Sequence, residues 1–216
     1  MRLGDCEYRD GLLYDPDGGT WGRFEGGLWR IGITPLLSWL SGGFTSISLK
    51  PMGTRIQLGN VLGSVEGAKH FEVVRAPFEC IINGTNPKVL RDPRAVNRDP
   101  FGEGWLVLLE RVGSESRFVS IVEAAPIIEE RLRSMHVSCF AEFPDVEMYE
   151  IGVECSAVLV RLNELLGRSP RGTVVHVVSD DPTAEIEMWR WREETGNSLL
   201  ETRAEGIIHH FLVRKS

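Results

Sequence analysis

The spacing of hydrophobic residues changes a little more than half-way along the chain. Up to about residue 120, short hydrophobic runs alternate with paired glycines and other turn-forming residues. Short strands at close and regular spacing are typical of a β-sandwich or a β-barrel. The clearest predicted strands cover 28–34, 46–49, 57–61 and 105–109.

A helical pattern follows these strands. From Val122 to Met135 apolar residues recur at spacings of three and four, which predicts one face of a helix. Pro126 lies near the start of this helix, in about the first turn, where proline is tolerated. The turn-forming sequence Phe143-Pro144-Asp145 comes next, and we expect 139–146 to be a linker between two domains, 1–138 and 147–216.

Strands and helices alternate beyond this linker. The predicted elements are a strand at 147–153, a helix at 155–166 stopped by Gly167, a strand at 173–178, a second helix ending near Gly196, and strands at 199–202 and 207–213. The second helix is expected to begin at Asp180-Asp181-Pro182, with Asp181 as its cap. The order βαβαββ predicts a two-layer α/β sandwich. The whole chain is therefore expected to be an α+β protein of two domains.

Composition and charge exclude some classes of function and indicate a cellular location. The net charge of −7 argues against a general binder of nucleic acid or of anionic membranes. No apolar run is long enough to span a bilayer, and residues 1–5 lack the apolar core of a secretion signal, so we expect a cytoplasmic protein. The cysteines Cys6, Cys80, Cys139 and Cys155 form no C-x-x-C pair, and in a reducing compartment we expect them to be free thiols.

Neither a metal site nor an acid–base pair stands out in the sequence. His209 and His210 are adjacent in a predicted strand, so they point to opposite faces and cannot ligate one metal together. We interpret both as structural residues. The chain is therefore expected to be a carrier rather than an independent enzyme.

Two segments of the first domain carry a specific pattern. The first is Gly63-Ser64-Val65-Glu66-Gly67-Ala68-Lys69, in which Lys69 falls at the turn between two predicted strands. The second is Asn97-Arg98-Asp99-Pro100-Phe101-Gly102-Glu103-Gly104-Trp105-Leu106. Together with Ile31-Gly32-Ile33-Thr34 and Asn86, this ordered set resembles the H protein of the glycine cleavage system. The resemblance covers roughly residues 29–112.

The resemblance implies a lipoyl-type β-sandwich, or barrel-sandwich hybrid, with lipoate attached covalently to Lys69. It also implies that Glu66 helps a lipoate-attaching enzyme to recognise the turn. The alternative interpretation is a solvated hairpin lysine. Biotin is disfavoured, because the biotin turn has methionine on both sides of its lysine. The chain departs from the family at Gly67, at His70-Phe71 and at Cys80.

The second domain resembles the small sulfur-relay proteins of the TusA type, over about residues 148–215. The shared features are Gly152-Val153-Glu154-Cys155, Ser179-Asp180-Asp181-Pro182 and the ending Phe211-Leu212-Val213-Arg214-Lys215. This resemblance implies that Cys155 carries a persulfide, and a helix N-terminus would lower the pKa of its thiol. Both prolines of the family's C-P-x-P are absent, which adds weight to the alternative of a buried structural cysteine, although a sulfur-carrying Cys155 remains the preferred interpretation.

The leading hypothesis joins the two resemblances in a lipoyl carrier of cytoplasmic sulfur metabolism. Sulfur would pass to Cys155 and then to a lipoyl arm on Lys69, because thiolates and persulfides attack disulfides directly. The partners would be a lipoate-attaching enzyme and sulfur-transfer or heterodisulfide-reductase-like proteins. The alternatives are a glycine cleavage H protein, serving glycine decarboxylase partners, with a C-terminal docking module, and a scaffold without lipoate.

Overall fold

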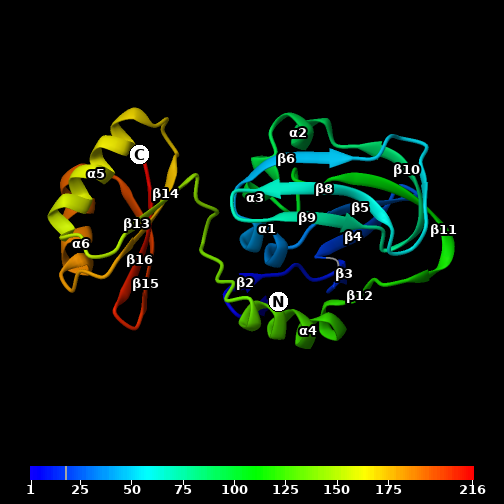
Figure 1. The fold of residues 1–216 in the computed structure, drawn as a ribbon, viewed down its shortest axis with the longest axis horizontal. Coiled ribbons are helices and arrows are strands. Elements are labelled where there is room, and N and C mark those ends of the chain that lie inside the picture. Colours follow the sequence, from blue (N-terminus) through cyan, green and yellow to red (C-terminus); the bar gives the residue numbers. More distant parts are fainter. Residues whose placement is uncertain (18) are drawn as a thin grey trace. The chain divides into compact units, whose positions relative to one another are not determined.

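The computed structural model describes residues 1–17 and 19–216. The chain divides into two compact units, Met1–Cys139 and Phe140–Ser216 (Figure 1). In the described part of the chain, every helix is too short or too polar to cross a bilayer.

The first unit is built mainly from antiparallel strands. Seven of them form one sheet in the order β12-β3-β4-β5-β11-β10-β7, and three form a second sheet in the order β6-β8-β9. The bounds are β1 Arg2–Leu3, β2 Cys6–Glu7, β3 Leu13–Asp15, β4 Thr20–Glu25, β5 Leu28–Ile33, β6 Phe44–Leu49, β7 Arg55–Ile56, β8 Val61–Gly67, β9 Phe71–Arg75, β10 Phe78–Thr85, β11 Val107–Ser116 and β12 Val119–Ser120. Buried apolar residues of both sheets share one core, so the unit is a β-sandwich.

Four helices complete this unit: α1 Pro35–Ser41, α2 Pro87–Arg91, α3 Arg94–Arg98 and α4 Ile121–Ser134. Helix α4 begins with a capping box, in which Ser120 accepts from the Glu123 amide and the Glu123 carboxylate accepts from the Ser120 amide. A second core lies between α4, α1 and the β1–β2 hairpin. The elements around this second core therefore cover one side of the sandwich (Figure 1).

Three details of this unit differ from the sequence predictions. The strand predicted at 57–61 is mainly a turn, because Gly59 has a positive φ of 77°. Pro126 lies inside α4 rather than in its first turn. Helix α4 buries Ile121 and Ala124, whereas Val122 is exposed. The apolar face predicted to begin at Val122 is therefore wrong in the first turn of this helix. A single misassigned residue is enough to rotate a helix face by 100°.

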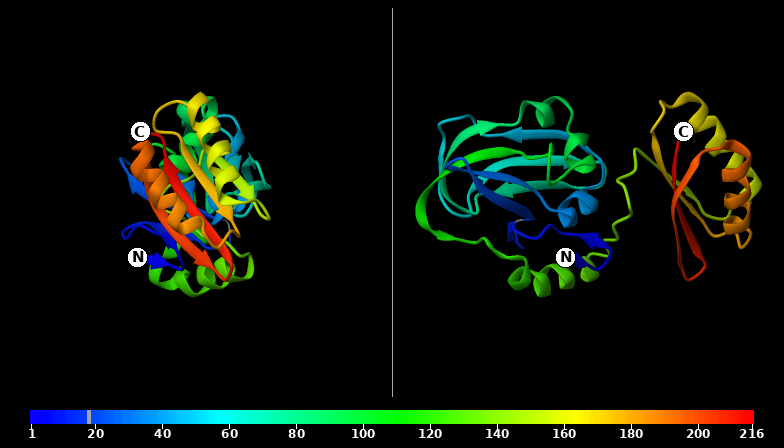
Figure 2. Two further views of the ribbon diagram at one scale, coloured as in Figure 1. Left: turned by 90° about the vertical axis from the view of Figure 1, so that its left-hand side faces the viewer. Right: turned by 180° about the vertical axis from the view of Figure 1, so that it is seen from behind.

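The second unit follows the order β13 Val146–Glu150, α5 Cys155–Arg168, β14 Val174–Ser179, α6 Ala184–Thr195, β15 Ser198–Glu205 and β16 Ile208–Arg214. The four strands form one sheet in the order β13-β14-β16-β15, and β13 is parallel to β14. Both helices pack on one face of this sheet (Figure 2). Gly167 does not stop α5, which continues to Arg168.

The segment expected to be a linker is packed rather than free. The Phe140 ring packs against the tilted His176 ring, with 4.5 Å between the centroids, and the Arg203 guanidinium lies 4.4 Å from the centroid of the Phe140 ring. The Ala141 amide donates to Glu201, and Glu142 pairs with Arg214. Residues 140–142 thus belong to the second unit as a strap across its sheet.

The expectation that all four cysteines are free thiols is wrong for two of them. Cys6 and Cys139 form a disulfide, whereas Cys80 and Cys155 are free and buried. The paired cysteines are 133 residues apart in sequence. They meet because both enter the same core, which spacing along the chain does not reveal.

Candidate functional site

Lys69 lies at the tip of the β8–β9 hairpin, and its side chain is exposed. The tip is closed by a hydrogen bond from the Gly67 amide to the His70 carbonyl, 2.9 Å long. Two further backbone amides fasten it to the loop after α1. The Ala68 amide donates to the Gly43 carbonyl, and the Lys69 amide donates to the Ser41 carbonyl. The lysine therefore stands on a fixed backbone with its side chain directed outward.

Glycines make this close approach possible. A Cβ on Gly67 would lie 2.1 Å from the Ser41 carbonyl oxygen, so no other residue fits there without displacing the hairpin. Gly42 has a φ of 75°, and a Cβ there would lie 3.2 Å from the Cγ of Lys69. The stem of Lys69 thus runs past the open face of Gly42. The departure from the family at Gly67 has a steric cause.

Asn97 holds the loop on which the hairpin rests. The side-chain oxygen of Asn97, Oδ1, accepts a hydrogen bond from the Phe44 backbone amide at 2.8 Å. Its amide nitrogen donates to the Ser38 hydroxyl at 2.9 Å and to the Gly42 carbonyl at 3.3 Å. Because Asn97 is buried, these bonds are made away from competing water. Asn97, the first residue of the motif at 97–106, therefore supports the hairpin that carries Lys69, the last residue of the motif at 63–69.

The rest of the second motif fixes the segment that carries Asn97. The Asp99 carboxylate accepts from the amides of Gly102 and Glu103. Asn86 donates to the carbonyls of Glu103 and Trp105. These bonds hold the turn-rich segment 97–106 in one conformation. The two motifs that the sequence singles out are thus parts of one structural unit.

Glu66 and the residues after Lys69 are accessible. Glu66 is exposed near the end of β8, where it pairs with Phe71 of β9. Phe71 is 62% exposed, which is unusual for a large aromatic side chain. Three exposed side chains, those of Glu66, His70 and Phe71, are therefore the neighbours of Lys69 at this tip.

A cavity of about 270 Å³ adjoins this hairpin. Its walls come from α1, β9, the end of α4 and the loop between β3 and β4. They include Leu36, Leu37, Leu40, Phe71, Arg131 and Met135. Arg131 also donates to the Pro16 and Asp17 carbonyls. The last turn of α4 is thus a wall of the cavity and is tied to the loop after β3.

Cys155 occupies the first position of α5, as the sequence predicts, but it is 3% exposed and packs in the core. Burial raises the pKa of its thiol to about 11, and the nearby carboxylates of Asp181 and Glu187 act in the same direction. Burial therefore outweighs the lowering of this pKa that is expected from a helix N-terminus. At neutral pH the thiol is protonated.

Asp181 acts on a different helix from the one expected. One of its carboxylate oxygens accepts from the Cys155 amide at 2.7 Å, and the other accepts from the amide and hydroxyl of Thr183. It therefore caps the first turn of α5 instead of α6. Asp180 accepts from the Gly152 amide in the same way. The Asp180-Asp181 pair joins the two loops at this end of the sheet.

His210 has a partner that the sequence analysis missed. His176 Nε2 lies 3.0 Å from His210 Nδ1, and the two rings are stacked beneath the Phe140 strap. Burial and His176 lower the pKa of His210. His176 lies within the apolar run of β14, so the sequence does not single it out. Its pairing with His210 arises because β14 lies beside β16. His209 is not part of this pair, and no group of three possible metal ligands occurs among the described residues.

Comparison with known proteins assigns the first unit. The family model of the glycine cleavage H-protein matches residues 12–131. A glycine cleavage system H protein 3 of Aquifex aeolicus is 32% identical over 112 residues, covering 51% of this chain and 70% of that protein. A probable glycine cleavage system H protein 2 of Sulfurisphaera tokodaii is 32% identical over 111 residues, covering 50% and 75%.

The fold agrees with this assignment. The crystal structure of a glycine cleavage system H protein from Mycobacterium marinum aligns with a TM-score of 0.50 at 24% identity. The alignment covers 55% of this chain and 97% of that one. The matched range contains Lys69, Asn97 and their supporting contacts. Proteins of this kind carry lipoate attached covalently to a lysine. Since the family model spans more than half of the 216 residues, the chain belongs to the glycine cleavage H-protein family.

Proposed function

We propose that the protein is a lipoyl carrier in which Lys69 Nζ holds lipoate through an amide bond. The observation that supports this most strongly is the attachment of the hairpin tip to the carbonyls of Ser41 and Gly43. A group that several enzymes must reach needs an exposed turn on a rigid scaffold. The residues present fit the group, because the Lys69 stem passes along the face that Gly42 leaves open.

The residues around Lys69 have separate tasks in this proposal. The Ser41 and Gly43 carbonyls orient the backbone, so that the lysine amine is presented in one place. Glu66 and Phe71, both exposed beside the tip, serve as contacts for the lipoate-attaching enzyme. The bound lipoyl group supplies a dithiol–disulfide couple at the end of a long stem.

Intact mass spectrometry tests the assignment. In a strain able to make lipoate, the wild-type protein is expected to gain one lipoyl adduct, and Lys69→Arg is expected to gain none. Arginine keeps the positive charge and length of lysine but does not offer its amine for acylation. Lys88→Arg is the matched control, since Lys88 is also exposed in the same unit. A wild-type protein without an adduct, or an adduct that persists in Lys69→Arg, would refute the proposal.

The cargo best supported is that of the family. The relatives are named glycine cleavage system H proteins, so we propose that glycine decarboxylase partners load an aminomethyl group in the cytoplasm. The second unit then acts as a docking module. This choice is also supported by the burial of Cys155, which raises the pKa of its thiol and disfavours the thiolate at neutral pH.

Sulfur carriage is the second candidate, favoured by one observation. Cys155 begins α5 directly after β13, within the βαβαββ order expected for a TusA-like sulfur carrier. In this function a persulfide donor RSSH would transfer its outer sulfur to Cys155, giving a Cys155 persulfide and the thiol RSH. The thiolate of Cys155 must form first, which requires that the buried thiol becomes more exposed, because burial is the largest cause of its raised pKa.

Thiol reactivity distinguishes the two candidates. With a thiol pKa of about 11, Cys155 is expected to react with iodoacetamide at pH 7 roughly a hundred times more slowly than an exposed cysteine. Cys155→Ser identifies the signal, and Cys80→Ser is the control because Cys80 is also free and buried. Rapid alkylation of Cys155, with stoichiometric persulfide formation from a donor, would support sulfur carriage and overturn the docking interpretation.

A further inference from the structure

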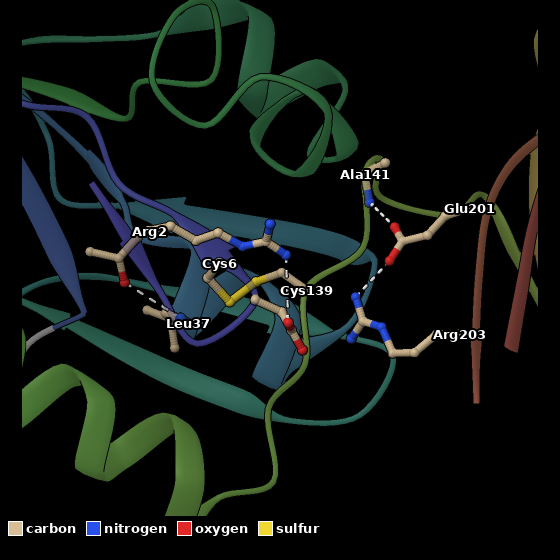
Figure 3. The surroundings of a disulfide bond; sticks show 9 residues. Arg2, Cys6, Leu37, Cys139, Ala141, Glu201 and Arg203 are labelled. Atoms are coloured by element: carbon tan, nitrogen blue, oxygen red, sulfur yellow. Dashed lines mark hydrogen bonds and ion pairs between the residues drawn. A yellow bond between two sulfur atoms is a disulfide. The ribbon is translucent and has the colours of Figure 1, made fainter. Parts of the chain in front are cut away.

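The disulfide between Cys6 and Cys139 joins the β1–β2 hairpin to the segment after α4 (Figure 3). Cys6 lies on β2, which pairs with β1 at Arg2↔Glu7 and Leu3↔Cys6, and two backbone bonds between Met1 and Tyr8 close the end of this short hairpin. A hairpin of this size is not stable alone. It depends on what it is fastened to.

The other cysteine follows an unfavourable turn. His136, directly after α4, has a φ of 51°, a left-handed conformation that non-glycine residues rarely adopt. The Val137 amide bonds back to the Leu132 carbonyl, so the turn ends α4 and redirects the chain toward Cys139. Because His136 does not favour this turn, its persistence depends on the contacts that hold residues 137–139.

The core around the disulfide is also the back of the cavity beside Lys69. Cys6 and Cys139 pack together with Leu36 and Leu132. Leu36 lines the cavity, and so do Arg131 and Met135 at the end of α4. Loosening the last turn of α4 would therefore move one wall of that cavity.

We propose that Cys6–Cys139 is a redox-controlled staple, which fixes the α4 wall of this cavity when oxidised and releases it when reduced. This role rests on the cytoplasmic location proposed above, since structural disulfides are rare in a reducing compartment and those that occur are usually catalytic or redox-sensing. The reductant is a dithiol. Its first thiolate attacks one cysteine sulfur, which releases the other cysteine and leaves a mixed disulfide. Its second thiolate then attacks the reductant sulfur of this mixed disulfide and releases the first cysteine. The dithiol becomes a disulfide by giving up two electrons, and two protons pass to Cys6 and Cys139.

Burial sets the route of this reaction. Cys6 is fully buried and Cys139 is 4% exposed, so a dithiol cannot reach them in the closed structure. We expect the β1–β2 hairpin to open more easily than the sandwich core, since short terminal elements sample open states more often than core strands do. Reduction therefore proceeds through opening of the hairpin, and the staple responds slowly.

Hydrogen exchange on the full chain tests the staple without lipoate. In the Lys69→Arg background, reduction with dithiothreitol is expected to raise amide exchange at 2–7 and 128–139 at least tenfold, while β10, β11 and the second unit stay unchanged. Cys6→Ser and Cys139→Ser are expected to exchange like the reduced protein in either redox state. Cys80→Ser is the control and keeps the redox response. Equal exchange in the oxidised and reduced proteins would overturn the proposal.

Alkylation under denaturing conditions tests the bond itself. The oxidised protein is expected to label only at Cys80 and Cys155, and the reduced protein at all four cysteines. Labelling of all four after air oxidation would overturn the proposal. His136→Gly gives a second readout, because it removes the unfavourable conformation and should reduce the effect of reduction on α4 exchange.

The effect on the lipoyl arm rests on the proposed function and is measured separately. In the lipoylated protein, reduction is expected to raise amide exchange at residues 71–73, which line the cavity next to Lys69. An unmodified Lys69 would remove this arm of the experiment and leave the result in the Lys69→Arg background intact. An unchanged rate at 71–73 in lipoylated protein would refute the coupling between staple and cavity.

Discussion

Replacing Gly67 by alanine is expected to lower the rate of Lys69 lipoylation by roughly tenfold or more. The added Cβ would lie 2.1 Å from the Ser41 carbonyl oxygen and 2.7 Å from its carbon. Both are backbone atoms, which cannot rotate away as a flexible side chain can. Overpacking of this kind typically costs about 1–3 kcal/mol, and about 1.4 kcal/mol corresponds to a factor of ten. The hairpin is therefore expected to leave the Ser41–Gly43 loop.

The measurement is the initial rate of adduct formation with a lipoate-attaching enzyme, followed by intact mass. Gly84→Ala is the matched control, since the nearest atom to its added Cβ is a Leu108 methyl carbon at 3.6 Å. Gly67→Ser, which restores the small residue usual in the family, is expected to be as slow as Gly67→Ala. A wild-type rate in either Gly67 variant would show that the attaching enzyme does not require the docked hairpin.

Replacing Asn97 by alanine is expected to destabilise the first unit by about 3 kcal/mol. The variant leaves the Phe44 amide, the Ser38 hydroxyl and the Gly42 carbonyl without their Asn97 partner. An unsatisfied buried polar group costs about 1–3 kcal/mol, and partial relaxation keeps the total below the sum. At the typical entropy of unfolding, the melting temperature of this unit should fall by on the order of 10 °C.

Calorimetry of the full chain measures this shift, and hydrogen exchange locates it. Exchange is expected to increase first at residues 41–44 and 67–70, because Asn97 acts on the hairpin through the loop. Asn83→Ala is the control: it makes the same change at an exposed strand position. Equal melting temperatures for Asn97→Ala and wild type would contradict the role assigned to Asn97.

The sequence predicts those features that depend on neighbouring residues. The turn at Lys69 follows from the apolar strands on either side of it, and α4 follows from its three-and-four spacing. The start of α5 at Cys155 is also local. In each case the physical cause acts within one or two turns of the chain, so the pattern of residue types is sufficient.

Contacts between distant segments are not visible in this way. Asn97 bonds to Phe44 across 53 positions, and Asp181 caps α5 from 26 positions away. The disulfide joins residues 133 apart. The pKa of Cys155 follows the same rule, because neighbours brought in by folding bury the thiol and place carboxylates beside it. Residue type indicates what each side chain can do, and the tertiary fold decides which partner it has.

The fastening of the lysine hairpin through main-chain atoms has an evolutionary consequence. The amides of Ala68 and Lys69 are held by carbonyl groups, which every amino acid provides. These bonds do not depend on the side chains at positions 70 and 71. On the proposed function, exposed residues such as His70 and Phe71 could differ between related carriers, and change which enzymes bind, while the backbone that holds Lys69 keeps its geometry.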